Sequence, residues 1–178
     1  MKKLIADRNQ VGRLIAECAK RVAGLTGAEK VVFLGIQTRG VILAQRLIEQ
    51  LKKLKKGKFP LGTLDITLYR DDFTQLGKHP VVKETRIDFD IEDKTVILVD
   101  DVLYTGRTIR AALDEIIDFG RPSRIMLLVL VDRGGRELPI QPDIFGELVE
   151  AGDNTDIRLM LSETDGEDAI YIVEEEGR

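Results

Sequence analysis

Cysteine and histidine are almost absent from this chain of 178 residues, which contains one of each. A single cysteine cannot form an internal disulfide, and one cysteine with one histidine is too small a ligand set for a zinc site. Cys18 falls among apolar residues that repeat at helical spacing over 11–22. This pattern predicts a buried thiol that packs in the core rather than a nucleophile. His79 lies in a polar Gly-Lys-His-Pro loop.

Long apolar runs are also missing. No segment approaches the length that crosses a membrane, and Lys2 and Lys3 are not followed by the apolar core of a signal peptide. We therefore expect a soluble, unprocessed, cytoplasmic protein with no membrane partner. Apolar residues make up 43% of the chain and no long linker divides it, which predicts one domain over residues 1–178.

The sequence matches neither of two common nucleotide-binding motifs. The spacing from Gly35 to Gly40 matches a Walker A loop, but Val41 stands where that loop requires a lysine, which argues against an ATPase. The dinucleotide-binding pattern G-x-G-x-x-G does not occur.

Apolar strand-like runs alternate with helical patterns along the chain. The pattern predicts helices at 8–23, 41–54 and 109–119, strands at 31–36, 63–70, 96–99 and 124–131, an irregular segment at 132–155, and a hairpin-like pair at 156–162 and 168–173. Strands separated by helices form right-handed βαβ units, so we predict an α/β fold with a mostly parallel, twisted sheet and helices on both faces. Ligands bind such sheets beyond the carboxyl ends of the strands.

The segment from Val96 to Thr108 carries the clearest chemical signal. Its apolar start predicts a buried strand, and Asp100 and Asp101 follow where that strand is expected to end. These carboxylates can accept hydrogen bonds from the vicinal hydroxyls of ribose, or hold a hydrated Mg²⁺. The small turn at 105–108 opens a helix, whose free N–H groups bind a phosphate. Two aspartates can also serve as plain helix caps, but the whole arrangement favours a site for a ribose 5-phosphate.

These thirteen residues resemble the phosphoribosyl pyrophosphate (PRPP) signature of type I phosphoribosyltransferases. Their version is most similar to that of the PyrR family of bifunctional pyrimidine operon attenuators and uracil phosphoribosyltransferases. Three more segments resemble this family in the same order: Gly35–Gly40, Asp65–Asp72 and Leu130–Ile140. The resemblance implies a type I phosphoribosyltransferase fold with a hood loop at about 70–86 and a C-terminal hairpin at about 156–174.

The implied reaction converts uracil and PRPP into uridine monophosphate (UMP) and pyrophosphate. Arg39, Asp100 and Asp101 are expected to stabilise the transition state, with Mg²⁺ bound through PRPP and by the two aspartates, and no general base is assigned. A hood that begins at the polar segment after Tyr69 would shield the reaction from water. The residues expected to bind PRPP or a nucleotide are Thr38, Arg39, Gly40, Tyr69, Arg70, Asp100, Asp101, Val102, Leu103, Tyr104, Thr105, Gly106, Arg107 and Thr108.

Base choice is predicted from three residues. Purine salvage members of the superfamily commonly carry an acid where this chain has Tyr104, so the tyrosine favours a pyrimidine. Asp132 and Arg133 resemble the family's wall of the base site, where donors and acceptors read the N–H and C=O edge of uracil. A plain surface ion pair is the alternative for this pair, and another base specificity stays open.

The resemblance also implies a homo-oligomer, dimer or higher, that binds a pyrimidine-operon leader RNA stem-loop in response to UMP or UTP. Residues 1–60 hold 14 Lys or Arg against 4 Asp or Glu, whereas residues 61–178 hold 13 against 27. Glu17 and Gln141 replace positive charge that the family carries, and the acidic C-terminal third would repel RNA. The alternative is therefore a phosphoribosyltransferase or nucleotide sensor without attenuator activity.

Overall fold

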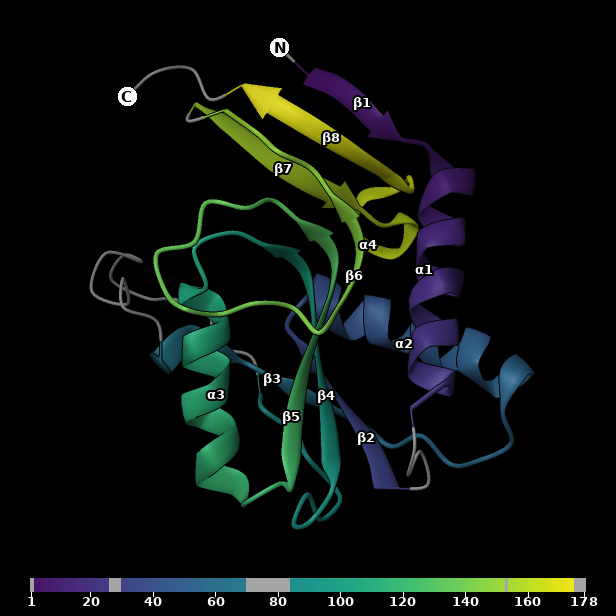
Figure 1. The fold of residues 1–178 in the computed structure, drawn as a ribbon, viewed down its shortest axis with the longest axis vertical. Helices are drawn as coiled ribbons and strands as arrows, with labels where there is room; N and C mark the ends of the chain where they lie inside the picture. Colours follow the sequence, from purple (N-terminus) through teal and green to yellow (C-terminus); the bar gives the residue numbers. More distant parts are fainter. Residues whose placement is uncertain (1, 26–29, 70–83, 153, 175–178) are drawn as a thin grey trace.

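The computed structural model describes residues 2–25, 30–69, 84–152 and 154–174 (Figure 1). Its elements in chain order are β1 (Lys2–Ala6), α1 (Arg8–Ala23), β2 (Val31–Ile36), α2 (Arg39–Leu54), β3 (Leu61–Leu64), a 3-10 helix (Ile66–Tyr69), β4 (Thr95–Leu103), α3 (Arg107–Phe119), β5 (Arg124–Asp132), β6 (Ile144–Leu148), β7 (Thr155–Met160), α4 (Ser162–Asp165) and β8 (Ala169–Glu174). No helix within these ranges is long and apolar enough to cross a membrane.

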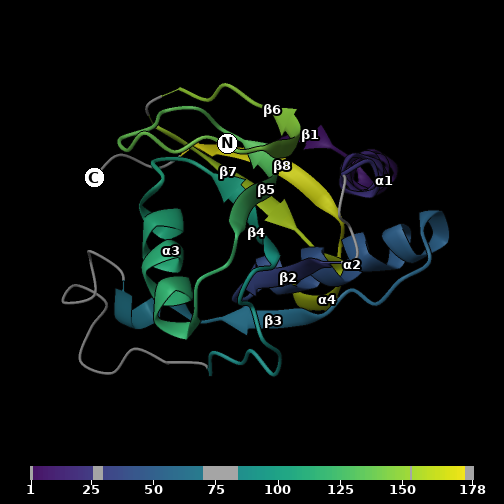
Figure 2. The same ribbon diagram turned by 60° about the horizontal axis from the view of Figure 1, so that its bottom comes forward.

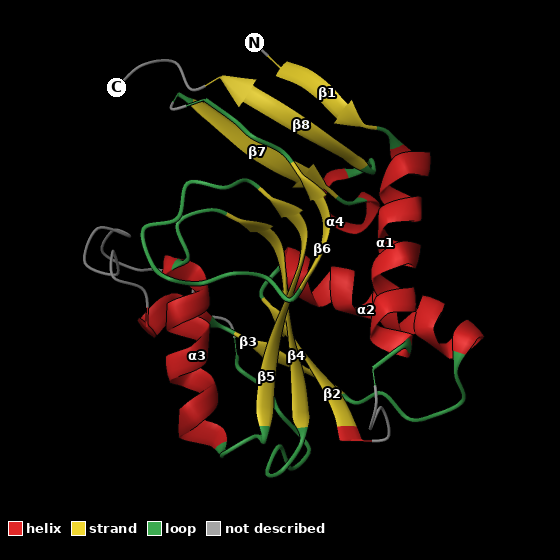
Figure 3. Ribbon diagram, viewed as in Figure 1, coloured by secondary structure: helices red, strands yellow, loops and turns green. Residues whose placement is uncertain are grey.

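The main sheet is parallel and has the strand order β3-β2-β4-β5-β6. Its central strands are apolar on both faces, since every residue of β2 is buried, and helices cover both sides. One core cluster packs α1 and α2 against the sheet, and a second packs α3 against the opposite face. Figures 2 and 3 show α3 across the sheet from α1 and α2. The predicted α/β fold is confirmed.

A second, antiparallel sheet has the order β1-β8-β7. β7 and β8 pair where the sequence predicts a hairpin-like pair, and the short helix α4 lies between them. Figure 1 shows this sheet beyond the carboxyl ends of the parallel strands, where ligands bind in folds of this kind. The small sheet therefore covers the region in which the sequence motifs predict a site.

Several predicted boundaries are wrong. The strand predicted at 63–70 is β3, which ends at Leu64 and gives way to the 3-10 helix. β4 continues to Leu103, so Asp100 and Asp101 lie inside the strand, because β5 still pairs with this part of it. Polar residues interrupt the apolar pattern there, although the backbone ladder does not stop.

Two strands lie in segments for which the sequence predicts none. β6 falls within residues 132–155, which were predicted to be irregular, and β1 precedes the first predicted helix. Both are edge strands, whose short segments show little periodicity of their own. Cys18 is buried on α1 as predicted, and burial raises the pKa of its thiol to about 11. Most of the expected hood loop, with Arg70 and His79, lies outside the described residues.

Candidate active site

A pocket of about 270 Å³ opens at the carboxyl ends of β2 and β4. It collects residues from segments that are far apart in the chain, including several that the sequence predicts as site residues. Its lining consists of Ile36, Gln37, Thr38, Arg39, Asp65, Ile66, Thr67, Asp100, Asp101, Val102 and Thr108. Polar and charged side chains dominate this lining, which suits a ligand that carries hydroxyl and phosphate groups.

The loop between β2 and α2 enters the pocket with its backbone close to β4. The Gln37–Thr38 peptide bond is cis. At Gly40, a Cβ atom would lie 2.4 Å from the carbonyl oxygen of Val99, so only glycine allows this approach. The start of α2 is therefore pressed against the strand that carries the acidic pair.

Arg39, at the first turn of α2, lies between two carboxylates. Its Nε donates to Asp165 Oδ2 at 3.1 Å and its Nη2 donates to Asp165 Oδ1 at 2.7 Å. This hydrogen bonding to Asp165 raises the pKa of Arg39, and the nearby Asp101 carboxylate adds to the effect. The guanidinium is thus a fixed cation at the edge of the pocket.

Asp100 and Asp101 form a buried acidic pair. Asp100 is only 7% exposed, and its Oδ1 accepts the N–H of Asp101 at 3.0 Å. Burial raises the pKa of Asp100 well above its usual range, and the neighbouring charge of Asp101 raises it further. Burial also raises the pKa of Asp101, although hydrogen bonds and Arg39 oppose this rise. Cations or hydroxyl donors would relieve this concentration of negative charge.

The turn at 105–108 opens α3, as predicted. Gly106 has a φ of 93°, a left-handed conformation that favours glycine, and α3 begins at the next residue. The carbonyl oxygen of Thr105 accepts the N–H groups of Glu137 and Leu138, so the loop after β5 braces the turn. The Nε of Arg107 donates to Glu137 Oε2 at 2.6 Å on the exposed side of the turn. Binding of a phosphate here would therefore depend chiefly on the backbone and the threonine hydroxyls.

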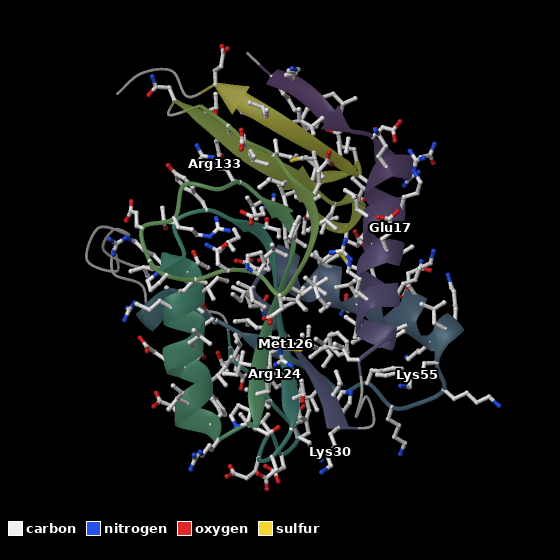
Figure 4. All side chains as sticks on the ribbon, in the orientation of Figure 1. Glu17, Lys30, Lys55, Arg124, Met126 and Arg133 are labelled. Carbon is white, nitrogen blue, oxygen red and sulfur yellow. The ribbon has the colours of Figure 1, made fainter. Side chains whose placement is uncertain are left out.

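The residues predicted to choose the base gather beside this turn. The guanidinium carbon of Arg133 lies 3.6 Å from the centre of the Tyr104 ring, a cation–π contact, and Tyr104 is 43% exposed. Arg133 is 8% exposed and donates to the carbonyl of Thr155 at the start of β7. Figure 4 shows Arg133 next to the small sheet. The expected base site therefore borders on both sheets.

Asp132 makes its hydrogen bonds within the same loop. Its Oδ1 accepts from the Nη2 of Arg136 at 2.6 Å and from the N–H of Gly134 at 2.9 Å. Arg136 also donates to three carbonyls, those of Ile140, Tyr104 and Gly134. This arginine organises the loop around the expected base site. Sequence reasoning missed it because nothing in the pattern distinguishes it from a solvent-exposed arginine.

Further residues line the site although the sequence predicts no role for them. A second pocket of about 370 Å³ is lined by Arg39, Asp101, Asp156, Ile157, Arg158 and Leu159. Its last four residues belong to β7, so the small sheet forms a wall of the site. Asp65, which lines the first pocket, lies in the segment Asp65–Asp72 that resembles the family, although the sequence predicts no role for this residue. The Tyr69 side chain lies outside the described part of the structure.

Comparisons with known proteins identify the family to which this fold belongs. The phosphoribosyl transferase domain family matches residues 3–156. A hypoxanthine-guanine phosphoribosyltransferase from Bacillus anthracis has a TM-score of 0.72 at 18% identity, with 96% of this chain and 97% of that chain covered. The hypoxanthine phosphoribosyltransferase of Trypanosoma cruzi has a TM-score of 0.69 at 19% identity, with 98% and 97% covered. At such identities the likeness shows the fold, and the fold with this pocket defines a type I phosphoribosyltransferase.

Sequence relatives narrow the assignment. The Bifunctional protein PyrR of Desulfosudis oleivorans is 55% identical over 148 residues, covering 83% of this chain and 82% of the relative. The Bifunctional protein PyrR of Deinococcus radiodurans is 45% identical over 176 residues, covering 98% and 96%. The chain belongs to the PyrR family. This result confirms the family and the enzyme class that the four sequence motifs predicted.

Proposed function

We propose that this protein transfers the ribose 5-phosphate of PRPP to N1 of uracil, producing UMP and pyrophosphate. We also propose that it binds a pyrimidine-operon leader RNA in response to uridine nucleotides. One observation carries the enzymatic proposal. The Arg39 loop and the acidic pair line the same pocket, and the turn that opens α3 contributes Thr108 to it.

The reaction breaks the bond between ribose C1 and a pyrophosphate oxygen. Positive charge develops on the ribose while negative charge grows on the departing pyrophosphate. Asp100 and Asp101 would accept hydrogen bonds from the ribose hydroxyls and stabilise the positive charge. Arg39 and the backbone before α2 would bind the pyrophosphate, and the turn at 105–108 would hold the 5-phosphate. Binding both phosphate ends in one orientation supplies much of the rate acceleration.

Mg²⁺ suits the acidic pair. Mg²⁺ prefers oxygen ligands and is commonly held by one or two carboxylates together with substrate phosphates. Asp100 and Asp101 offer such carboxylates, and burial raises the pKa of both, with the charge of Asp101 raising that of Asp100 further, so a cation would stabilise their ionised forms. The described ranges contain no cluster of three or more His, Cys, Asp or Glu residues that could hold a metal, so the ion would be shared with PRPP. When bound, it would neutralise charge on the leaving pyrophosphate.

Base selection would fall to the loop after β5. Because the Asp132 carboxylate accepts hydrogen bonds from Arg136 and from the N–H of Gly134, it would act mainly by fixing the conformation of this loop. Arg133, Tyr104 and the loop's backbone groups are then the nearest candidates to read the edge of uracil. Tyr104 also stands in place of the acid found in purine-specific members, which favours a pyrimidine.

A base-competition assay tests the enzymatic proposal. Uracil, hypoxanthine, guanine and adenine are supplied separately at equal concentration with PRPP and Mg²⁺, and nucleotide formation is followed by chromatography. We expect uracil to react faster than each purine by about two orders of magnitude, since unpaired polar groups penalise the wrong base. Faster conversion of any purine would overturn the assignment of uracil.

RNA binding is supported by family membership and by the charge of the amino-terminal part. Arg8, Arg13 and Lys20 are exposed on α1, although Glu17 is exposed on the same helix (Figure 4). Affinity that depends only on basic residues falls steeply with added salt, whereas recognition of an unpaired loop retains a sequence preference. Gel-shift titrations with a pyrimidine-leader stem-loop and a scrambled loop, at low and physiological salt, separate these cases.

We expect the native loop to be preferred at physiological salt. Equal binding to both loops, abolished by salt, would instead indicate an enzyme or nucleotide sensor without attenuator activity. We further propose a homo-oligomer, which size-exclusion chromatography with light scattering would detect.

A further inference from the structure

The turn between β7 and β8 docks on α2 through a set of ion pairs. We refer to residues 162–168, which include the short helix α4, as the acidic turn. On the α2 side, Arg39 and Arg46 are seven residues apart and therefore share a face of the helix. The Nη2 of Arg46 lies 2.6 Å from Glu163 Oε2 and 2.7 Å from Asp168 Oδ1, while Arg39 pairs with Asp165.

Asp165 is the member of this turn that reaches the candidate active site. Both of its carboxylate oxygens accept from Arg39 in a two-point, parallel arrangement. Its Oδ2 also accepts the N–H of Leu161 at 2.9 Å and the hydroxyl of Thr164 at 2.8 Å. Its side chain is 10% exposed. The carboxylate is therefore fixed by its own turn, and the arginine is fixed by the carboxylate.

This contact leaves one edge of Arg39 available to a ligand. Asp165 uses the Nε and Nη2 groups, and within the described residues Nη1 makes no hydrogen bond. Arg39 lines both the 270 Å³ pocket and the 370 Å³ pocket, and Asp101 lines both with it. The guanidinium thus lies at the junction of the pockets, where a pyrophosphate group would meet the acidic pair.

We propose that Asp165 is a positioning residue for the PRPP site, because it holds Arg39 with its Nη1 edge free to bind the pyrophosphate. A long arginine side chain at a helix start is otherwise free to adopt many rotamers, and that freedom is lost when a ligand binds. Holding it in advance removes this cost from PRPP binding. Asp165 also keeps the guanidinium from pairing fully with Asp101, which the proposed reaction needs for the ribose.

This inference rests on the proposed function, and the acidic turn supplies a matched control. Glu163 belongs to the same turn and pairs with Arg46, but it makes no hydrogen bond to Arg39. Glu163→Gln therefore disturbs docking of the turn without removing the support of Arg39. Asp165→Asn removes the charge at nearly constant shape, and Asp165→Glu keeps the charge with one more methylene.

The test measures KM and kcat for PRPP and uracil, with PRPP binding followed separately by calorimetry in the presence of Mg²⁺. We expect Asp165→Asn to raise the PRPP KM and dissociation constant about tenfold, a typical effect of losing a charge-assisted pair. The uracil KM should change much less, Asp165→Glu should recover part of the loss, and Glu163→Gln should behave as the wild type. An unchanged PRPP affinity in Asp165→Asn would overturn the proposal.

A double-mutant cycle separates positioning from simple support of the fold. Once Arg39→Ala is present, Asp165→Ala should weaken PRPP binding no further, since there is no arginine left to position. Independent, additive losses would show that Asp165 acts through the fold alone. Thermal unfolding of each variant identifies any that fails to fold, and Thr164→Val, which removes one hydrogen bond to Asp165, then provides a milder test in the same direction. A wild type that binds PRPP but does not use uracil would refute the proposed base and leave the role of Asp165 testable by calorimetry.

Discussion

Asp100 illustrates at the residue scale how a functional group can oppose stability. Its carboxylate is buried next to Asp101, and both burial and the neighbouring charge raise its pKa. The ionised form is therefore less favourable in the folded state than in the unfolded chain. Such a residue costs stability above its unfolded pKa, which is consistent with a role that requires its charge.

Replacing this charge should separate stability from activity. In metal-free buffer at pH 7, we expect Asp100→Asn to raise the free energy of unfolding by about 1–2 kcal/mol. The wild type loses stability as the pH rises through the raised pKa of folded Asp100, whereas the amide of the variant has no proton to lose. Turnover of uracil with PRPP should fall by orders of magnitude in Asp100→Asn and in Asp101→Asn. Denaturant titration and the nucleotide assay measure both effects. Asp114→Asn, at an exposed position of α3, serves as the control, and wild-type turnover in Asp101→Asn would contradict the assigned role.

Arg136 shows the opposite case, a charged residue that stabilises its surroundings. Its side chain is 12% exposed, and it joins Asp132 to the carbonyls of Ile140 and Tyr104. Arg136→Met would leave the buried Asp132 carboxylate without its cationic partner, with only the N–H of Gly134 as a donor, so we expect a loss of about 2–4 kcal/mol of stability. The uracil KM should rise more than the PRPP KM. Arg124→Met, which breaks an exposed pair with Asp143, is the control, and equal effects of the two variants would argue against this role.

At the element scale, the site depends on how closely α2 approaches β4. A Cβ on Gly40 would meet the Val99 carbonyl oxygen, and a Cβ on Gly35 would lie 2.6 Å from the Cα of Val41. Both obstacles are backbone atoms, which cannot move aside as a flexible side chain can. The two glycines therefore let the Arg39 loop lie against the acidic pair.

A pair of glycine substitutions tests this packing. We expect Gly40→Ala to lower the free energy of unfolding by about 1–3 kcal/mol, as overpacking does, and to reduce PRPP-dependent turnover by displacing the loop. Gly12→Ala on α1 meets no atom within 4 Å, so it should raise helix stability by up to about 1 kcal/mol and leave turnover unchanged. Chemical denaturation and initial-rate assays suffice. A Gly40→Ala variant as stable and active as the wild type would refute the packing argument.

At the scale of the whole molecule, the acidic turn connects the small sheet to α2, which packs on the main sheet. Hydrogen bonding to Arg39 lowers the pKa of Asp165 to about 2, and hydrogen bonding to Arg46 lowers that of Asp168 to about 2, from 3.8 in both cases. Carboxylates with depressed pKa values stabilise the fold above their unfolded pKa, and this stabilisation disappears as the pH falls through the folded value.

The connection should therefore weaken in acid. We expect the wild type to lose stability between about pH 4 and pH 2 through these two groups, and Asp168→Asn to lose less over the same interval because it has one group fewer to protonate. At pH 7 the variant should be less stable than the wild type by on the order of 1–2 kcal/mol. Urea titrations at a series of pH values measure both differences. Parallel pH dependences for the two proteins would show that Asp168 does not contribute.

The order of the main elements could be predicted from the sequence, since central parallel strands and amphipathic helices are encoded by local patterns. Residues 31–36 and 125–131 carry no polar side chain because both faces of the sheet are covered there. The four motifs are equally local, so they were sufficient to identify the family and to place Thr38, Arg39 and Asp100 near one end of the sheet.

Tertiary structure alone determined what depends on partners distant in the chain. β1 is held by β8, and the continuation of β4 through Asp101 depends on β5, so neither could be inferred from its own residues. From composition alone, the acids of the C-terminal third are expected to act as unpaired negative charge that repels RNA. In the structure, Asp165 and Asp168 form ion pairs with arginines of α2. Composition records how many charges a chain carries, whereas only the fold determines which of them meet, because an ion pair depends on distances that the chain's order does not specify.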